Sequence, residues 1–408
     1  MRAVGPGILF AGAAIGVSHL VQSTRAGAEY GWFLLWAVAL ALVAKYPFLE
    51  HAHRYTVAAG ESLLEGYARL GRWALVLFML VVVGSAFITL AAVTVVTAGL
   101  AGALFGVSAS PLVLSAALLG LCLALLLPGR FGLLDLGMKA MVLVLGALTL
   151  TGVVVAAAHG PAGDPGWQRP TLWDVGGVTF LLALMGWMPT PLDVGAWSSL
   201  WVLEKHKEQG VPRTLAAARL DFNLGYLATT LTAFTFLAFG ALVMYGTGTR
   251  FADGGVAFSG QLIDMYAGTL GQWSRWLIAT AAFITMFSTT ITVLDGYART
   301  LAGGLGLLAA GGRPWGRRAA AVLMLVLAAM ALLIIGRLMG TMKALVDFVT
   351  VLAFLTAPLV AVLNFRVVRL PHIAPDMRPG RVMTALSWFG FVFLAGFGVA
   401  WAWVRWLA

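Results

Sequence analysis

The sequence has 408 residues, of which 61% are hydrophobic and only 10% are charged. A soluble globular domain carries about 25% charged residues, so this composition excludes a soluble protein, because too little polar surface is available to cover its core. The formal net charge of +10 is scattered over short loops, which favours orientation signals over a nucleic-acid-binding face, and we expect no nucleic-acid partner.

Apolar segments recur from end to end, and eleven of them are long enough to span the hydrocarbon core of a lipid bilayer. They are predicted at residues 6–29, 32–50, 74–103, 110–128, 134–158, 175–202, 215–245, 270–303, 318–337, 341–365 and 384–406. The linkers are short, so residues 1–408 are predicted to form one all-α polytopic transmembrane domain. The segment Glu61–Trp73 has its apolar residues on one helical face and is predicted to lie along the interface.

Lysine and arginine residues gather in alternate loops. If the N-terminus is cytoplasmic, the cytoplasmic loops carry most of them, whereas the opposite loops hold few, among them Arg169 and Arg250. This bias predicts a multi-pass protein of the cell membrane with a cytoplasmic N-terminus and an external C-terminus. No cleavable signal peptide is expected, because Met1–Gly7 lead directly into a spanning segment.

The eleven spans divide into five, five and one. This division predicts inverted repeats at about 5–158 and about 174–366, followed by an extra helix at about 384–406. A repeat with an odd number of spans inserts its second copy upside down, and transporters use such repeats. Interrupted spans at equivalent places in the two repeats then mark a substrate site. The first and sixth spans are both interrupted, so they are predicted to be unwound in mid-membrane.

The interruption in the sixth span is GWMPTPLD, Gly186 to Asp193. Pro189 and Pro191 lack amide donors and clash with the carbonyl groups four residues earlier. Freed carbonyls are costly in lipid, so they must face a cavity, a cation or neighbouring protein. Asp193 is an expensive charge at this depth, which indicates a pathway or a paired site, with a water-accessible structural carboxylate as the alternative.

The interruption in the first span is Gly16-Val17-Ser18-His19. His19 could bind a metal ion through a neutral imidazole or accept a proton near neutral pH, although an isolated histidine also often only hydrogen-bonds across helices. In the sixth span, Met188 offers a soft thioether that suits transition metals, with ordinary apolar packing as the alternative.

The predicted substrate site combines the two interruptions. Its members are Gly16, Ser18, His19, Gly186, Met188, Thr190 and Asp193, and His19, Met188 and Asp193 are the candidate metal ligands. Other charged residues near helix ends are more readily explained by snorkelling or local neutralisation. They are Lys45, Glu50 and the pairs Asp135/Lys139, Asp295/Arg299 and Lys343/Asp347, each spaced i,i+4.

Enzymatic signals are weak in this chain. The single cysteine, Cys122, excludes a cysteine-cluster metal site, and the sequence has neither a His-x-x-x-His pair nor a Ser/His/Asp set at one depth. We therefore expect no enzyme and no cofactor, while the oligomeric state stays open.

The opening GPGILFAGAAIGVSHLVQSTRAGAEYGWFLLW resembles the first transmembrane helix of the Nramp family of proton-coupled divalent metal transporters. The leading Gly-Pro, the pairs Ala26-Gly27 and Tyr30-Gly31 and the following Leu-Leu-Trp carry the likeness, and Met188-Pro189 matches the start of the family's Met-Pro-His motif. The resemblance implies a LeuT-like fold of 11 transmembrane helices, with helices 1 and 6 unwound around the substrate. It also implies secondary transport of a divalent ion such as manganese or iron by alternating access, as a symport with protons.

The chain departs from the family at the site itself. Where the family has Asp-Pro-Gly-Asn, this sequence has Gly16-Val17-Ser18-His19, so the metal-binding aspartate and the asparagine are lost. Thr190 replaces the histidine of Met-Pro-His, and the third and ninth spans lack the family's charges for a proton route. Two alternatives follow. The chain is a divergent metal transporter in which Asp193 replaces the lost carboxylate, or it carries a small organic solute or a complexed metal.

Overall fold

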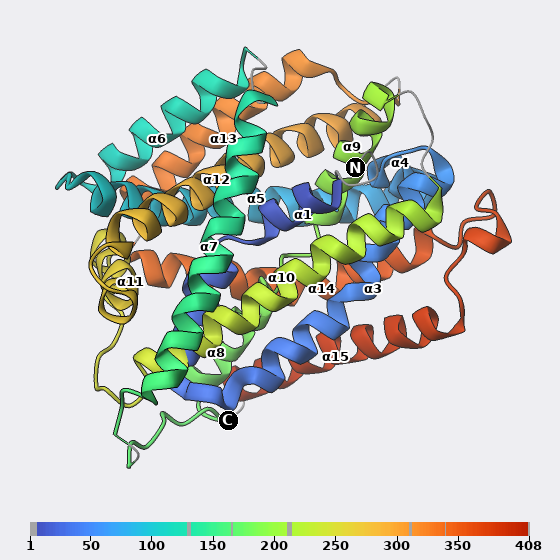
Figure 1. The fold of residues 1–408 in the computed structure, drawn as a ribbon. Helices are drawn as coiled ribbons and strands as arrows, with labels where there is room; N and C mark the ends of the chain where they lie inside the picture. Colours follow the sequence, from blue (N-terminus) through green and yellow to red (C-terminus); the bar gives the residue numbers. More distant parts are fainter. Residues whose placement is uncertain are drawn as a thin grey trace.

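Long apolar helices make up most of the fold (Figure 1). The computed structural model describes residues 6–128, 132–164, 166–209, 214–309, 312–338 and 340–406, and these residues contain no β-strand. The described helices are α1 (Pro6–Ala14), η1 (Ser18–Ser23), α2 (Thr24–Tyr30), η2 (Gly31–Leu34), α3 (Leu35–Ala59), α4 (Leu63–Leu70), α5 (Arg72–Phe105), α6 (Pro111–Leu126), α7 (Gly132–His159), α8 (Val175–Gly186), α9 (Val194–Gln209), α10 (Leu215–Val243), α11 (Gly255–Leu270), α12 (Ser274–Leu308), α13 (Arg317–Arg337), α14 (Met342–Val367), η3 (Pro375–Met377) and α15 (Arg381–Trp406).

Eight continuous helical segments among the described residues are long and apolar enough to cross a membrane. Seven of them correspond one to one to predicted spans, and the eighth, Ser18–Ala59, joins the end of the first span to the second because no loop separates α2, η2 and α3. The fourth predicted span corresponds to the shorter helix α6, and the sixth is divided between α8 and α9. The count of eleven spans and the inverted repeats therefore stay predictions.

Two connecting segments are also helical. The predicted interfacial segment contains α4, which begins with a capping box: Ser62 accepts from the Glu65 amide, and the Glu65 carboxylate accepts from the Ser62 amide. Leu63, Leu64 and Tyr67 on its apolar face are buried. The sequence predicted no helix between 245 and 270, where α11 lies, because Gly255–Leu270 is only moderately apolar and ends immediately before the next span.

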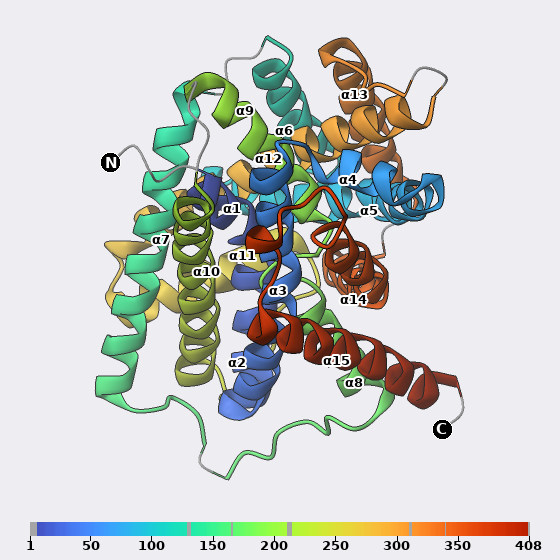
Figure 2. The ribbon, with the colours of Figure 1, turned by 90° about the vertical axis from the view of Figure 1, so that its right-hand side faces the viewer.

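The two interrupted spans lie inside the bundle rather than at its edge. The segments α1 and α2 pack on α10, while α8 packs on α14 and on α3. Helix α12 packs on α5 and also contacts α1 and α9. Figure 2 shows α15 lying outside α14, α3 and α8, with which it is in contact. The breaks are therefore shielded from lipid by neighbouring helices, as freed backbone groups require.

Candidate substrate site

The first span is interrupted at the predicted place. Helix α1 ends at Ala14, Ile15 and Gly16 leave helical geometry, and the π-helical turn η1 begins at Ser18. Gly16 lies against Thr289 of α12, since a Cβ atom at this position would come within 3.0 Å of that side chain. The Thr289 hydroxyl lies 3.4 Å from the Ile15 carbonyl oxygen, so α12 partly replaces the lost helical hydrogen bond.

Both ring nitrogens of His19 are hydrogen-bonded in this conformation. Nε2 lies 3.0 Å from the Thr229 carbonyl oxygen of α10, and a carbonyl only accepts, so Nε2 carries a proton. In a neutral ring Nδ1 then accepts from the Ser18 hydroxyl, 2.8 Å away. The His19 side chain is completely buried. Its roles as a metal ligand and as a proton acceptor stay predictions, and either one requires this ring to change partners.

The second interruption contains Pro189 and Pro191, as the sequence predicts. Helix α8 ends at Gly186, α9 begins at Val194, and residues 187–193 between them are not helical. Gly186 packs directly on the backbone of α14, because a Cβ atom there would lie 1.8 Å from the Thr350 carbonyl oxygen. Met188 and Thr190 are buried within the interruption, and the Met188–Pro189 peptide bond is cis.

The two interruptions touch each other. The Ser18 hydroxyl lies 3.2 Å from the Pro189 carbonyl oxygen and 3.0 Å from the Ala14 carbonyl oxygen. The Ser18 hydroxyl has one proton and three neighbouring acceptors, namely these two carbonyls and His19 Nδ1. Rotation of this hydroxyl can therefore make or break its bond to the Pro189 carbonyl. The structure thus places Ser18 and His19, two residues of the predicted site, beside the Pro189 carbonyl of the other interruption.

Asp193, which ends the second interruption, has a partner on α12. Its carboxylate accepts from the Tyr297 hydroxyl of α12 at 2.9 Å, and that hydroxyl lies 3.4 Å from the Thr89 hydroxyl of α5. Asp193 immediately precedes α9, where the helix dipole favours an anion. A cavity of about 10 Å³, lined by Asp193, Tyr297, Thr89, Trp187 and Ser85 among others, lies beside it and has room for about one water molecule.

His19 and Asp193 are held by different partners, Thr229 and Tyr297, in this conformation. No hydrogen bond joins Asp193 to Ser18 or His19 among the described residues. In the same residues, no three side chains of histidine, cysteine, aspartate or glutamate are grouped as a metal site would need. Met188 and Asp193 keep their predicted roles as proposals, because each remains at the interruption.

The sequence analysis did not identify Lys45 as a residue of the site. We expected snorkelling towards the end of a span at residue 50, but α3 continues to Ala59, so Lys45 lies in mid-helix and its side chain is completely buried. Its ammonium donates to the carbonyl oxygens of Met185 at 2.8 Å, Gly186 at 2.5 Å and Thr190 at 3.3 Å. The expectation for Lys45 was therefore wrong, because the predicted helix ended too early.

Glu50 is locally neutralised, as expected, but in the interior. Its carboxylate lies 2.7 Å from the Arg54 guanidinium and 3.2 Å from that of Arg219 on α10, and its side chain is 1% exposed. The pair Asp295/Arg299 forms as the spacing indicated, with 2.8 Å between its atoms. The side chains of Asp135 and Lys139 lie outside the described part of the chain.

Asp347 pairs with a distant residue instead of Lys343. Arg25 of α2 is buried and donates to both Asp347 oxygens of α14, at 2.7 and 3.3 Å. Gln22 bonds to both Arg25 and Asp347 at 3.0 Å. Lys343 lies 3.5 Å from Asp253 instead. The i,i+4 pairing expected for Lys343 and Asp347 was therefore wrong, and this cluster ties the segment after the first interruption to α14.

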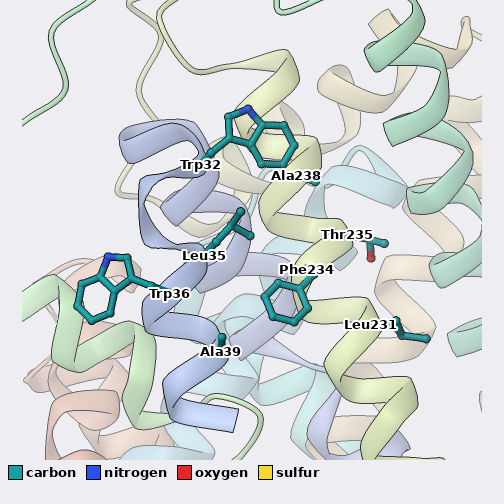
Figure 3. A pocket seen from close by; sticks show the side chains of 8 residues that line it. All are labelled: Trp32, Leu35, Trp36, Ala39, Leu231, Phe234, Thr235 and Ala238. Carbon is teal, nitrogen blue, oxygen red and sulfur yellow. The ribbon is translucent and has the colours of Figure 1, made fainter. Parts of the chain in front are cut away.

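One groove lies away from the interruptions, between α10 and the segment that contains η2 and the start of α3. Figure 3 shows Trp32 and Leu35 beside α10 and the Trp36 ring on the other side of its helix; together with Ala39 they line a groove of about 560 Å³. The α10 side of the groove is formed by Leu231, Phe234, Thr235 and Ala238. Only one of these side chains is polar, so the groove fits the lipid-facing exterior and has no groups that would hold a charged substrate.

Comparison with known proteins identifies the family. A model of the family described as natural resistance-associated macrophage protein-like matches residues 7–404. The chain belongs to the Nramp family. The resemblance seen in the first helix and in Met188-Pro189 is thereby confirmed. This Nramp chain is also 36% identical over 399 residues to the uncharacterised protein PM0681 of Pasteurella multocida strain Pm70, covering 97% of this chain and 90% of that protein.

Solved structures agree on the fold. The Nramp chain superposes on the Eremococcus coleocola manganese transporter with a TM-score of 0.70 at 14% identity, covering 98% of this chain and 85% of that one. MhsT bound to L-phenylalanine gives a TM-score of 0.65 at 15% identity, with 98% of both chains covered. Mhp1, a nucleobase-cation-symport-1 family transporter, gives 0.59 at 15% identity, with 98% and 93% covered. The predicted all-α LeuT fold with interrupted helices is therefore confirmed.

Proposed function

We propose that this Nramp protein is a secondary active transporter that carries a divalent metal ion of the manganese or iron kind by alternating access. Family membership and the similarity to the Eremococcus coleocola manganese transporter support this substrate class. The observation that carries the location of the site is the contact of Ser18 with Pro189, which joins the two interrupted spans. Interrupted helices meeting near the middle of a membrane domain are where such transporters bind substrate.

The proposed site is altered from that of the family. Met188 supplies a soft thioether and Ser18 a hydroxyl, and the interrupted backbone supplies carbonyl oxygens. His19 and Asp193 are buried beside the site but are held by Thr229 and Tyr297 in this conformation. Metal binding that used either side chain would require it to exchange that partner for the ion.

A second candidate substrate is favoured by Lys45. Its ammonium lies at the interruption, where it would repel a bare divalent ion held at the same carbonyls. A small organic solute with an anionic group, or a metal held in an anionic complex, would meet no such repulsion. We keep this as the alternative to the bare metal ion.

We also propose the membrane arrangement that the loop charges favour. The protein would lie in the cell membrane with its N-terminus in the cytoplasm and its C-terminus outside, because lysine and arginine are concentrated in one set of loops. Coupling to protons as a symport is proposed from the family resemblance alone. Reconstitution into liposomes with a pH-sensitive dye inside tests it, and metal uptake without acidification of the lumen would contradict it.

Uptake of Mn²⁺ into proteoliposomes tests the proposed substrate. We expect uptake above that of empty liposomes, and a loss of at least about tenfold in Met188→Leu, because the thioether ligand is replaced by a hydrocarbon of similar volume. Met330→Leu makes the same change at an exposed position of α13 and is the matched control. Absence of metal-dependent flux, together with thermal stabilisation by an organic anion and by no metal ion, would favour the alternative substrate.

A further inference from the structure

Lys45 contacts carbonyl groups of Met185 and Gly186 that have lost their regular α-helical partners, although the Met185 carbonyl also accepts a long bond of 3.4 Å from the Met188 amide. In a continuous helix the Met185 carbonyl would accept from the amide of residue 189, but Pro189 has no amide hydrogen. The Gly186 carbonyl would accept from Thr190, which lies outside helical geometry. Both carbonyls belong to the last turn of α8, where the negative end of the helix dipole adds to their field.

The geometry around Lys45 is that of a cation site. Three carbonyl oxygens converge on one point, at 2.5 to 3.3 Å from the ammonium nitrogen. The three carbonyl oxygens are enough to accept one bond from each of the three ammonium N–H groups. Unwound backbone carbonyls and helix carboxyl ends coordinate free cations in membrane transporters.

We propose that the Lys45 ammonium is a tethered cation that occupies a cation position at the second interruption. It neutralises the freed carbonyls of Met185, Gly186 and Thr190 and excludes free cations from them. Lys45 is then a specificity-determining residue. A substrate ion must be held on the Ser18 and Met188 side of the interruption, away from these carbonyls. This inference rests on the location of the substrate site in the proposed function. It adds that Lys45 keeps cations away from one part of that site.

Removing the ammonium should open the position to an external cation. We compare the purified wild-type protein with Lys45→Met, following thermal unfolding by tryptophan fluorescence in NaCl and in MnCl₂ at constant ionic strength set with choline chloride. We expect Lys45→Met to unfold at a lower temperature than the wild type in choline. It should regain stability with added Na⁺ or Mn²⁺, binding one of them at least about tenfold more tightly than the wild type.

Two control variants separate charge from packing. Lys45→Arg keeps a positive charge at the carbonyls, so it should show no gain in cation binding. Lys343→Met removes a partly exposed lysine whose partner is Asp253, so it should behave as the wild type. Binding is measured on purified protein without transport, so an absence of Mn²⁺ flux would refute the proposed substrate and leave this test intact.

A folded Lys45→Met protein that binds both cations no more tightly than the wild type would overturn the proposal. If that variant does not fold, Lys45→Gln takes its place, since it keeps a neutral N–H₂ donor for the carbonyls, and the same comparison decides. A wild-type crystal soaked in Mn²⁺ gives an independent measurement. An anomalous peak bonded to the Met185 or Gly186 carbonyl oxygen, with Lys45 still in place, would also overturn it.

Discussion

The hydroxyl of Ser18 lies 3.2 Å from the carbonyl oxygen of Pro189, and the two residues are 171 positions apart in the chain. This contact joins the interruption of the first span directly to that of the sixth. Replacing Ser18 by alanine removes the only side-chain group that makes this contact among the hydrogen bonds of the described residues.

We expect Ser18→Ala to lose about 1 kcal/mol of stability, the usual contribution of one buried hydrogen bond. Its transport should fall by a larger factor than this loss explains, because the substrate position depends on the same hydroxyl. Ser198→Ala is the matched control, since buried Ser198 donates only to the Gly195 carbonyl of its own helix. Equal transport by the two variants would show that the Ser18 contact has no role in the site.

The buried pair Arg25 and Asp347 should contribute strongly to stability. The Arg25 side chain is only 3% exposed, so Asp347→Asn leaves this buried charge with only its longer contact to Glu29 at 3.6 Å, and we expect a loss of up to about 3–5 kcal/mol. Chemical unfolding in detergent measures it. Glu204→Gln breaks the exposed pair with Arg299 and should cost less than about 1 kcal/mol. Similar losses in both variants would contradict the importance of burial.

Gly186 should tolerate no side chain. A Cβ atom there would lie 1.8 Å from the Thr350 carbonyl oxygen, so Gly186→Ala must push α8 away from α14. We expect a loss of roughly 1–3 kcal/mol, the range for an overpacked interior, and a lower unfolding temperature. Gly84→Ala in α5 is the control, because open space surrounds Gly84 and alanine favours helix by about 1 kcal/mol. An unfolding temperature of Gly186→Ala equal to that of Gly84→Ala would refute the close packing.

The ion pair Glu61 and Arg69 predicts a dependence of stability on acidic pH. The Arg69 guanidinium bonds to both oxygens of Glu61 and holds the pKa of this carboxyl below its ordinary value of 4.5. The folded state therefore binds the proton less readily than the unfolded state. The stabilisation is present above about pH 4.5 and is lost as the pH falls through the lowered pKa.

Thermal unfolding between about pH 3 and 7 checks this prediction, with Glu61→Gln as the comparison. The difference in unfolding temperature between the wild type and Glu61→Gln should shrink at the acidic end. The pair is partly exposed, so salt should reduce the difference as well. A constant difference over the whole pH range would rule out a contribution from the charged pair.

The positions of both interruptions could be predicted because their causes are local. Pro189 and Pro191 cannot continue a helix whatever surrounds them, and Gly16 is followed by polar residues in an otherwise apolar run. The family could be predicted for the same reason, since its motifs in helices 1 and 6 are continuous stretches of sequence. These parts of the prediction needed no knowledge of the packing.

The partners of the charged side chains could not be predicted in the same way. Lys45 was assigned to a helix end because the hydropathy of the second span falls after residue 50, although α3 continues to Ala59. Asp347 was paired with Lys343, the nearest lysine in the sequence, whereas its partner Arg25 is 322 residues away. Spacing along one helix carries no information on which other helix crosses it, and these pairings depend on that crossing.

The cavity beside Asp193 has a consequence for hydration. Its volume of about 10 Å³ admits roughly one water molecule, so an ion that reaches Asp193 in this conformation arrives almost without its hydration shell. Magnesium gives up its water reluctantly, whereas larger and softer ions exchange theirs more readily. A divalent ion that entered this space beside Asp193 would therefore lose most of its hydration shell, at a cost that is greatest for magnesium.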